Sequence, residues 1–464
     1  MSAMASAGLT RVKIFEMAAR AESDSSVYFR AVNMLVEEFR FDYPEACRRV
    51  GLKAKSDNMR SFLLRLSDAL RSGEPMSEFL SREAEAQSEE YESRYERDLE
   101  SLKQWTNAFS SITISVALII IVQVISSMIY SMNSAVMGGL VLTGIMMSAM
   151  STWIIYRSAP REQMVMPARQ GSQEQKRAVK RLKLLGPIAG ASAALMFVLG
   201  VELGYVLIWV AVLLVPVGWA SMMSDKSRRK KDEEFATFLR SSGGMASSSG
   251  TTLNQALNRL DLSSFPHLQA DIERLSKRLN ARIDPIRAWH QFGMETGSKL
   301  ISSVADIFYG AIQLGGDPER VGYLCSLFAA KTSQLRARRK LTAGTFSGLI
   351  TVMQAAVAGL MVFVLAIVTN FADLVSTLMP AEDAAAGQQQ MSLGMAEFSA
   401  SDIQFLSTLT VSMVLMLALV SAAAIIFSDG GFKLKVAFYI ALTVFISGLC
   451  LLIVPPMVTN IVKI

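Results

Sequence analysis

The chain has 464 residues, of which 51% are hydrophobic and 19% charged, with a formal net charge of +6 and a mean hydropathy of +0.34. This composition excludes an ordinary water-soluble globule and favours a protein with several membrane spans. The cysteines Cys47, Cys325 and Cys450 have no paired spacing, which argues against a disulfide framework or a zinc site. The start of the chain has no apolar core of secretory type, so no signal cleavage is expected.

Residues 1–104 are expected to form a cytoplasmic helical domain, because apolar residues recur every three or four positions, as at Leu63, Leu66 and Leu70. The stretch RSGEPMSEFL, residues 71–80, predicts a turn between two helices. In this turn Gly73 ends one helix in the left-handed conformation, Glu74 caps the next, and Pro75 takes its first position.

Seven segments are apolar and long enough to cross a bilayer, which requires about 20 residues. They are 106–130, 135–156, 184–201, 203–222, 345–370, 403–427 and 436–460. The resulting domains are 1–104 (cytoplasmic), 105–157 (a transmembrane hairpin), 158–183 (a basic cytoplasmic loop), 184–222 (a second hairpin), 223–344 (a second cytoplasmic helical domain), 345–370 (the fifth span), 371–402 (an acidic outer loop) and 403–464 (the last two spans). The predicted fold class is therefore an all-α polytopic membrane protein.

The loops predict the orientation of these spans. The 158–183 loop has seven Lys or Arg and two acids, whereas the 371–402 loop has five acids and no Lys or Arg. Basic loops stay in the cytoplasm. Both helical domains and the N-terminus are therefore expected inside the cell membrane, and the C-terminus outside.

The turn at residues 71–80 has a second copy. At an offset of 243 residues, Gly73 and Pro75 fall on Gly316 and Pro318 and the two acids coincide. The turn residues of this copy are Gly315, Gly316, Asp317 and Pro318. A fainter match at an offset of 210 pairs residues 43–52 with 253–262. The two cytoplasmic domains are thus predicted to be helical bundles related by duplication.

The helices that follow the two turns differ in charge. Residues 81–103 carry eight acids and four bases, and their counterparts 324–346 carry five bases and no acid. Three interpretations stay open for the basic helix: contact with anionic lipid headgroups, docking of an acidic protein surface, or attraction between the acidic and basic helices. Nucleic acid is not expected as a partner, because the bases lie close to the membrane.

No catalytic, cofactor or metal site is predicted. The Gly-rich stretch 241–252 lacks the lysine of a phosphate-binding P-loop. His267 and His290 stand 23 residues apart without clustered ligands. Glu202 falls in a short outer turn, which favours exposure to water over an intramembrane ion pathway.

Two pairs of glycines, each separated by three residues, would permit close approach of helices in lipid. They are Gly186 with Gly190 and Gly344 with Gly348. The contact could lie within the chain or across a homodimer.

The order of parts resembles a known family. LRSGEPMSEFLSREAEA (70–86) and IQLGGDPERVGYLCSLFAA (312–330) are each a Gly-rich turn in a helical domain that precedes a membrane span. This pattern is similar to the type II secretion F domain of the inner-membrane platform proteins of type IV pilus-like machines. Bacterial platforms typically have three spans, so seven spans look more like the archaeal branch, which includes the archaellum platforms.

The resemblance implies a non-enzymatic platform that couples a cytoplasmic hexameric ATPase to the insertion of pilin-like or archaellin subunits. Membrane lipids and a second copy of the chain are further expected partners. Candidate ATPase-docking residues are Arg228, Arg229, Lys230, Lys231, Arg336, Arg338, Arg339 and Lys340.

Two alternatives remain. The platform could serve an adhesive type IV pilus or a secretion system instead of an archaellum. A protein of another class, a seven-helix transporter or receptor, would need intramembrane polar groups, for which only Gln123, Asn133 and Gln354 are available.

Overall fold

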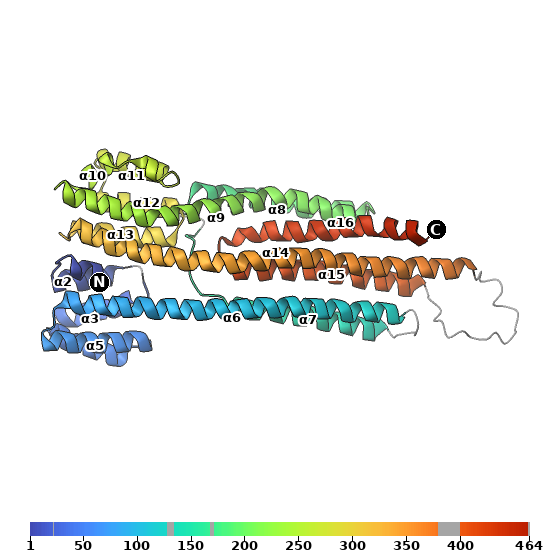
Figure 1. The fold of residues 1–464 in the computed structure, drawn as a ribbon, viewed down its shortest axis with the longest axis horizontal. Helices are drawn as coiled ribbons and strands as arrows, with labels where there is room; N and C mark the ends of the chain where they lie inside the picture. The colour runs from blue at the N-terminus through green and yellow to red at the C-terminus, as the bar shows by residue number, and fades with distance from the viewer. Residues whose placement is uncertain (22, 128–133, 168–170, 379–399, 463–464) are drawn as a thin grey trace. The chain divides into compact units, whose positions relative to one another are not determined.

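The computed structural model describes residues 1–21, 23–127, 134–167, 171–378 and 400–462 (Figure 1). In these ranges the chain is helical, and its one β-contact is an isolated bridge between Val165 and Ser298. The predicted all-α class is confirmed. The helices are α1 Ser2–Ser6, α2 Arg11–Arg20, α3 Ser26–Glu37, α4 Tyr43–Lys53, α5 Asp57–Ser72, α6 Met76–Ser127, α7 Ser134–Ser158, α8 Gln173–Val198, α9 Leu203–Ser248, α10 Leu253–Arg259, α11 Gln269–Asn280, α12 Pro285–Thr296, α13 Lys299–Gln313, α14 Pro318–Leu378, α15 Ala400–Asp429 and α16 Val436–Val462.

The chain divides into two compact units. The first unit comprises Met1–Glu96, Gln163–Gln173 and Lys226–Arg336. The second unit comprises Arg97–Glu162, Glu174–Asp225 and Ala337–Ile464. The helices α6, α9 and α14 contain residues of both units.

The first unit has one continuous core that both predicted cytoplasmic segments build. Phe15 and Leu63 come from the N-terminal segment, and Phe238, Trp289 and Phe308 come from the segment after residue 223. All five side chains are at most 1% exposed. Burying large apolar side chains is the main favourable contribution to folding, so Met1–Glu96 and Lys226–Arg336 are held together by this shared core.

Five helices have counterparts 242 or 243 residues later, and α2 to α6 correspond in order to α10 to α14. Their first residues are Arg11 and Leu253, Ser26 and Gln269, Tyr43 and Pro285, Asp57 and Lys299, and Met76 and Pro318. The offset of 210 residues does not hold, because α10 corresponds to α2 and α4 corresponds to α12. Short amphipathic helices share a 3.6-residue period, which explains the accidental match. The helix order supports duplication.

The two turns differ by one residue from their predicted alignment. Gly73 has a φ of +76° and Gly315 has a φ of +97°, whereas Gly316 is not left-handed. Gly315 is therefore the counterpart of Gly73. The carboxylate of Asp317 accepts from the backbone N–H of Glu319 and of Arg320, each at 3.3 Å. In the first turn Glu74 pairs instead with Arg82, and α6 begins after Pro75.

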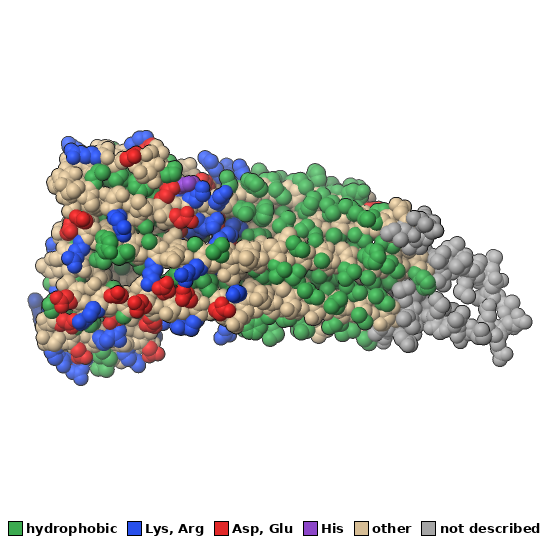
Figure 2. Space-filling model, in the orientation of Figure 1, with side chains coloured by type: hydrophobic (Ala, Val, Ile, Leu, Met, Phe, Trp, Pro, Cys, Tyr) green, Lys and Arg blue, Asp and Glu red, His purple; other side chains and the backbone are tan. Residues whose placement is uncertain are grey.

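The second unit has an apolar outer surface, as expected for helices in contact with lipid (Figure 2). Six helices of the described ranges are long and apolar enough to cross a membrane, and each overlaps one of the seven predicted spans. The remaining predicted span, 184–201, falls on α8 and is not among them. The start of α8 is strongly basic, which leaves a short apolar end.

Two helices run without interruption through the places where spans were predicted to begin. α6 continues through Trp105, and α14 continues through Gly344. A Cβ added at Gly344 or at Gly348 would meet no atom within 4 Å. The close approach predicted for this glycine pair is therefore not made with any residue that the structure describes.

Candidate functional site

The basic residues predicted for docking lie on α9 and α14, where the two helices bring several of them into internal ion pairs. In the first unit the guanidinium of Arg228 donates to Asp232 Oδ2 at 3.0 Å, and that of Arg336 donates to the same oxygen at 2.9 Å. All three side chains are at least nine-tenths buried. A buried carboxylate between two guanidinium groups fixes α9 against α14, because removing one partner would leave an uncompensated buried charge.

A second network in the first unit ties α9 to α11 and α12. Lys231 Nζ lies 2.7 Å from the buried carboxylate of Asp271, which also pairs with Arg274. Arg274 and Arg278 both pair with Glu295 of α12. Burial raises the pKa of Glu295, but the hydrogen bonds and charges of the two arginines outweigh burial and hold the pKa below its ordinary value.

In the second unit, Arg339 of α14 binds the end of α15. Its guanidinium donates to the carbonyl oxygens of Ser428 at 2.9 Å, Phe427 at 3.1 Å and Pro160 at 2.8 Å. The last carbonyls of a helix have no intrahelical donors, and they carry partial negative charge. Arg339 therefore caps α15 and joins it to the segment after α7.

A buried charge cluster lies beside this cap. Lys435 Nζ, at the start of α16, is 2.7 Å from Asp225 of α9 and also pairs with Asp429 at the end of α15. Lys340 Nζ of α14 is 2.5 Å from Asp429. The four charges balance, and the cluster connects four helices of the second unit.

Two glycines make room for these basic side chains. Gly430 has a φ of +66°, and a Cβ at this position would overlap the guanidinium of Arg339. A Cβ at Gly431 would lie 2.7 Å from Lys435 Nζ and 2.9 Å from Asp225 Oδ1. The loop between α15 and α16 is thus shaped around the charges.

The remaining docking candidates are more accessible. Arg229 and Lys230 are half-buried on α9, and Arg338 is exposed on α14. Between the two helices that differ in charge, Lys331 pairs with Glu92 at 2.7 Å. This ion pair is a direct contact between the acidic and the basic helix, so it supports the third interpretation of the basic helix, attraction between the two.

The stretch 241–252 has a packing role. A Cβ at Gly243 would lie 2.4 Å from the carbonyl oxygen of Pro318 and 3.3 Å from Gly322 Cα, so α9 and α14 touch backbone to backbone at this point. Thr252 caps α10 by accepting from the N–H of Gln255. The chain needs small residues here for helix contact and for a turn.

The histidines have structural partners. His267 Nδ1 lies 2.5 Å from Glu234 Oε1, and His290 Nδ1 lies 3.3 Å from Asp306 Oδ2. Across the described residues, no group of three or more His, Cys, Asp or Glu side chains could hold a metal ion. Burial raises the pKa of the Cys47 thiol to about 12, which keeps this cysteine protonated and unreactive.

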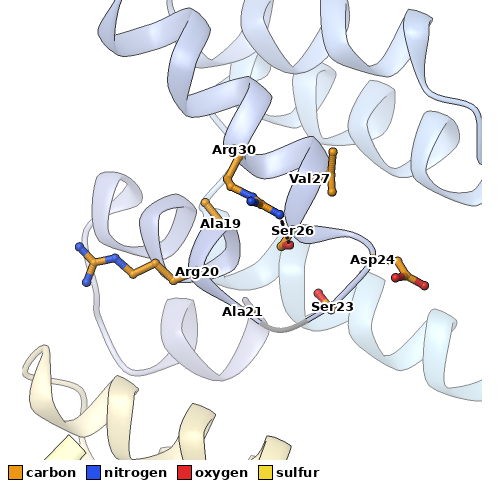
Figure 3. A pocket seen from close by; sticks show the side chains of 8 residues that line it. All are labelled: Ala19, Arg20, Ala21, Ser23, Asp24, Ser26, Val27 and Arg30. Carbon is orange, nitrogen blue, oxygen red and sulfur yellow. Dashed lines mark hydrogen bonds between the residues drawn. The ribbon is translucent and has the colours of Figure 1, made fainter. Parts of the chain in front are cut away.

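A pocket of about 680 Å³ opens between α2 and α3 (Figure 3). Arg20 and Asp24 point away from each other, and Arg30 is bonded to Ser26 at 3.2 Å. Ligand sites need polar groups that converge on one point, and the polar groups of this pocket do not.

Sequence reasoning identified Arg339 and Lys340 but missed the buried cluster that Lys340 joins, which also contains Asp225, Asp429 and Lys435. The available signal was chemical: charges at span ends, two of them beside the Gly430–Gly431 pair, are expensive to bury and need partners of opposite sign.

Comparisons with known proteins give a consistent result. Residues 1–124 match the family model for the type II secretion system (T2SS) protein F. The chain is 26% identical over 329 residues to Flagella accessory protein J of Methanocaldococcus jannaschii, a match that covers 68% of this chain and 58% of that protein. It is 24% identical over 465 residues to Flagella accessory protein J of Methanococcus voltae, covering 97% of this chain and 81% of that protein. No solved structure matches.

The predicted resemblance to the type II secretion F family is confirmed by these matches, and the matched residues include the first Gly-rich turn. The alignment spans less than two thirds of the M. jannaschii relative. A secretion-system component and an accessory protein also agree with the predicted non-enzymatic role.

Proposed function

We propose that this chain is the cell-membrane platform of an archaeal type IV pilus-like machine, most simply an archaellum, which couples a cytoplasmic hexameric ATPase to the insertion of archaellin or pilin-like subunits. The observation that carries the proposal is the continuity of α6 and α14. Each helix begins in the packed helical unit and ends in an apolar span. Packed elements move as rigid bodies, so such helices suit the transfer of mechanical work.

The proposed topology has the N-terminus and the first unit in the cytoplasm and the C-terminus outside. Its support is the contrast between the basic 158–183 loop and the acidic 371–402 loop. Residues 379–399 of the acidic loop lie outside the described residues. Labelling of single cysteines introduced at Ser101 and Ser401 by a membrane-impermeant reagent tests this topology, and labelling of Ser101→Cys in intact cells would overturn it.

We place the ATPase contact on Arg229 and Lys230, with Arg338 as a third member. The burial of Arg228, Arg336 and Arg339 and the ion pairs of Lys231 and Lys340 give those candidates internal roles. An accessible pair of bases on a long helix suits an acidic partner surface, because complementary charge speeds association and selects partners.

The experiment is co-purification of the full chain with the assembly ATPase of the same organism. R229E/K230E is expected to lower ATPase recovery at least about tenfold, since two like-charge contacts replace two attractive ones. The matched control K53E/K55E reverses two exposed bases at the end of α4 and should leave recovery unchanged. Unchanged recovery with R229E/K230E would move the docking site elsewhere.

Deletion of the gene distinguishes the machines. Loss of swimming and of the archaellum filament, restored by the wild-type chain, is expected for an archaellum platform. Retained swimming with loss of surface attachment would identify an adhesive pilus instead.

A transporter or receptor finds little support in the second unit. Gln354 is satisfied by Val414 and Ser447 within the helices. Both polar side-chain atoms of Gln123 are buried without a hydrogen bond to a described residue. Asn133, the third such residue, lies outside the described residues.

A further inference from the structure

The helix α8 has two halves of different character. Its apolar half, residues 184–198, exposes Leu184 (66%), Leu195 (62%) and Val198 (82%). Its first half carries five bases, all exposed and without a hydrogen bond or ion pair to any described residue. They are Lys176, Arg177, Lys180, Arg181 and Lys183. Figure 2 shows Lys and Arg side chains gathered near the start of α8.

The register between α8 and α9 sets the depth of these bases. Trp209 Nε1 donates to Ser192 Oγ at 3.3 Å, and the two helices run antiparallel because a short turn joins them. Lys183 lies nine residues before Ser192, and Gly218 lies nine residues after Trp209. In antiparallel helices, Lys183 is therefore at about the same depth as Gly218 and its neighbour Trp219. The Trp219 side chain is 61% exposed, and tryptophan rings on membrane proteins favour the headgroup region.

The apolar half of α8 is too short to span the hydrocarbon. Its 15 residues extend about 22 Å at 1.5 Å per residue, against about 30 Å of hydrocarbon. The bilayer can adapt by thinning locally, and Lys and Arg side chains can extend along the helix to reach the headgroups. Either adjustment brings the five bases into the headgroup layer.

We propose that the basic half of α8, together with Trp219, is a binding surface for anionic phospholipid headgroups of the cytoplasmic leaflet, as the proposed topology defines it. The phosphate groups of these lipids would give the exposed ammonium and guanidinium groups anionic partners, which no described residue provides. A lipid is favoured over a soluble acidic protein, because the basic surface continues directly into an exposed apolar helix. Each base near an anionic membrane surface contributes attraction that salt weakens.

The test uses the full chain in proteoliposomes and measures how strongly it immobilises nitroxide-labelled phosphatidylglycerol relative to labelled phosphatidylcholine. The wild type is expected to prefer phosphatidylglycerol. K176Q/R177Q/K180Q/R181Q should lower this preference at least about fivefold, since each base contributes about that factor. The readout requires neither the ATPase nor a filament, so its failure is separable from that of the proposed function.

Two control variants make the result specific. R48Q/K53Q/K55Q/R71Q removes four exposed bases from the first unit and should retain the preference. K176R/R177K/K180R/R181K keeps the charge and should also retain it. Retained preference in the α8 neutral variant, or equal loss in both neutral variants, would overturn the proposal. Should the neutral variant fail to insert, K176Q/R177Q and K180Q/R181Q are each expected to lose part of the preference, and no loss in either would also overturn it.

Discussion

At the scale of single residues, Lys435 is the most constrained charge in the second unit. It is 2% exposed and lies between two carboxylates. Removing one member of a buried pair leaves a charge that neither water nor protein compensates, which typically costs about 3–5 kcal/mol.

We therefore expect K435Q to lower the apparent melting temperature in detergent strongly, by an amount that corresponds to about 3 kcal/mol or more. The matched control is K433Q, which removes the same charge from an exposed position two residues earlier and should change little. Tryptophan fluorescence during heating measures both. Equal melting temperatures for the two variants would show that the buried cluster does not stabilise the fold.

Glu295 supplies a pH-dependent contribution in the first unit. Its pKa in the folded chain is held below the ordinary value of 4.5 by Arg278 and Arg274. A lowered folded-state pKa stabilises the protein above the ordinary pKa, and this contribution is lost as the pH falls through the folded-state pKa.

The E295Q variant is expected to be less stable than the wild type at pH 7 by about 1 kcal/mol, because the ion pairs are partly exposed. The difference should shrink as the pH falls below 4.5. Thermal unfolding of both proteins from pH 3.5 to 7 measures the profile, with E319Q at an exposed acid as the control. If the stability difference between E295Q and the wild type did not change with pH, the lost stability would come from packing and not from the charge of Glu295.

The sequence could reveal which residues are charged near span ends, but not which of them pair. Arg339 and Lys340 stand next to each other and were predicted to do the same task. Yet Arg339 caps a helix, whereas Lys340 joins the buried cluster. Adjacent helical positions point about 100° apart, so their partners depend on packing that one sequence does not specify.

At the scale of helices, the second Gly-rich turn owes its geometry to Asp317. Two backbone N–H groups of the first turn of α14 donate to its carboxylate. Loss of such a cap costs about 1 kcal/mol.

The D317A variant is expected to lose about that much stability, and D317N should keep most of it, because asparagine caps nearly as well. The control is E74A, since Glu74 pairs only across the surface with Arg82 and surface pairs contribute little. Apparent melting temperatures of the three variants decide the point. If E74A destabilised the protein as much as D317A, the proposed difference between the two turns, a capping carboxylate in the second turn alone, would be wrong.

Helix existence followed from hydrophobic periodicity, and most boundaries followed from Gly and Pro. The exception is α8, where the shortest of the seven spans was predicted at residues 184–201, a helix that is not among those apolar and long enough to cross a membrane. A helix forms there, but it ends at Val198, which leaves only the residues 184–198 after the last base, Lys183. The repeat register was also off by one residue, because Gly315 and Gly316 are indistinguishable as letters and only the backbone angle separates them.

At the scale of the whole molecule, the proposed function depends on the covalent continuity of α6 and α14. Apolar positions at Tyr95, Leu99 and Leu102 lead toward the first predicted span, and this pattern predicts a helix that runs from the cytoplasmic bundle into the membrane. α6 contains all of these residues, and each is at most 8% exposed. Sequence could not predict that both repeats share one core, since that depends on contacts between segments more than 200 residues apart.

A break in α6 should therefore uncouple the two units while leaving each folded. Gln104 is exposed and lies within α6, just before Trp105. Proline there removes one helical hydrogen bond and clashes with the preceding turn, at a cost of about 3 kcal/mol. Glycine costs about 1 kcal/mol relative to alanine and loosens the helix without breaking it.

If α6 transmits work as a rigid element, filament assembly in a deletion strain should fall in the order Q104A, Q104G, Q104P, with Q104A close to wild type. Electron microscopy of filaments measures assembly, and immunoblots of membrane fractions confirm that each variant inserts at equal level. Because the three substitutions share one exposed site, a difference among them reports on the helix and not on a lost side-chain contact. Full assembly by Q104P at normal membrane level would show that force does not pass along α6.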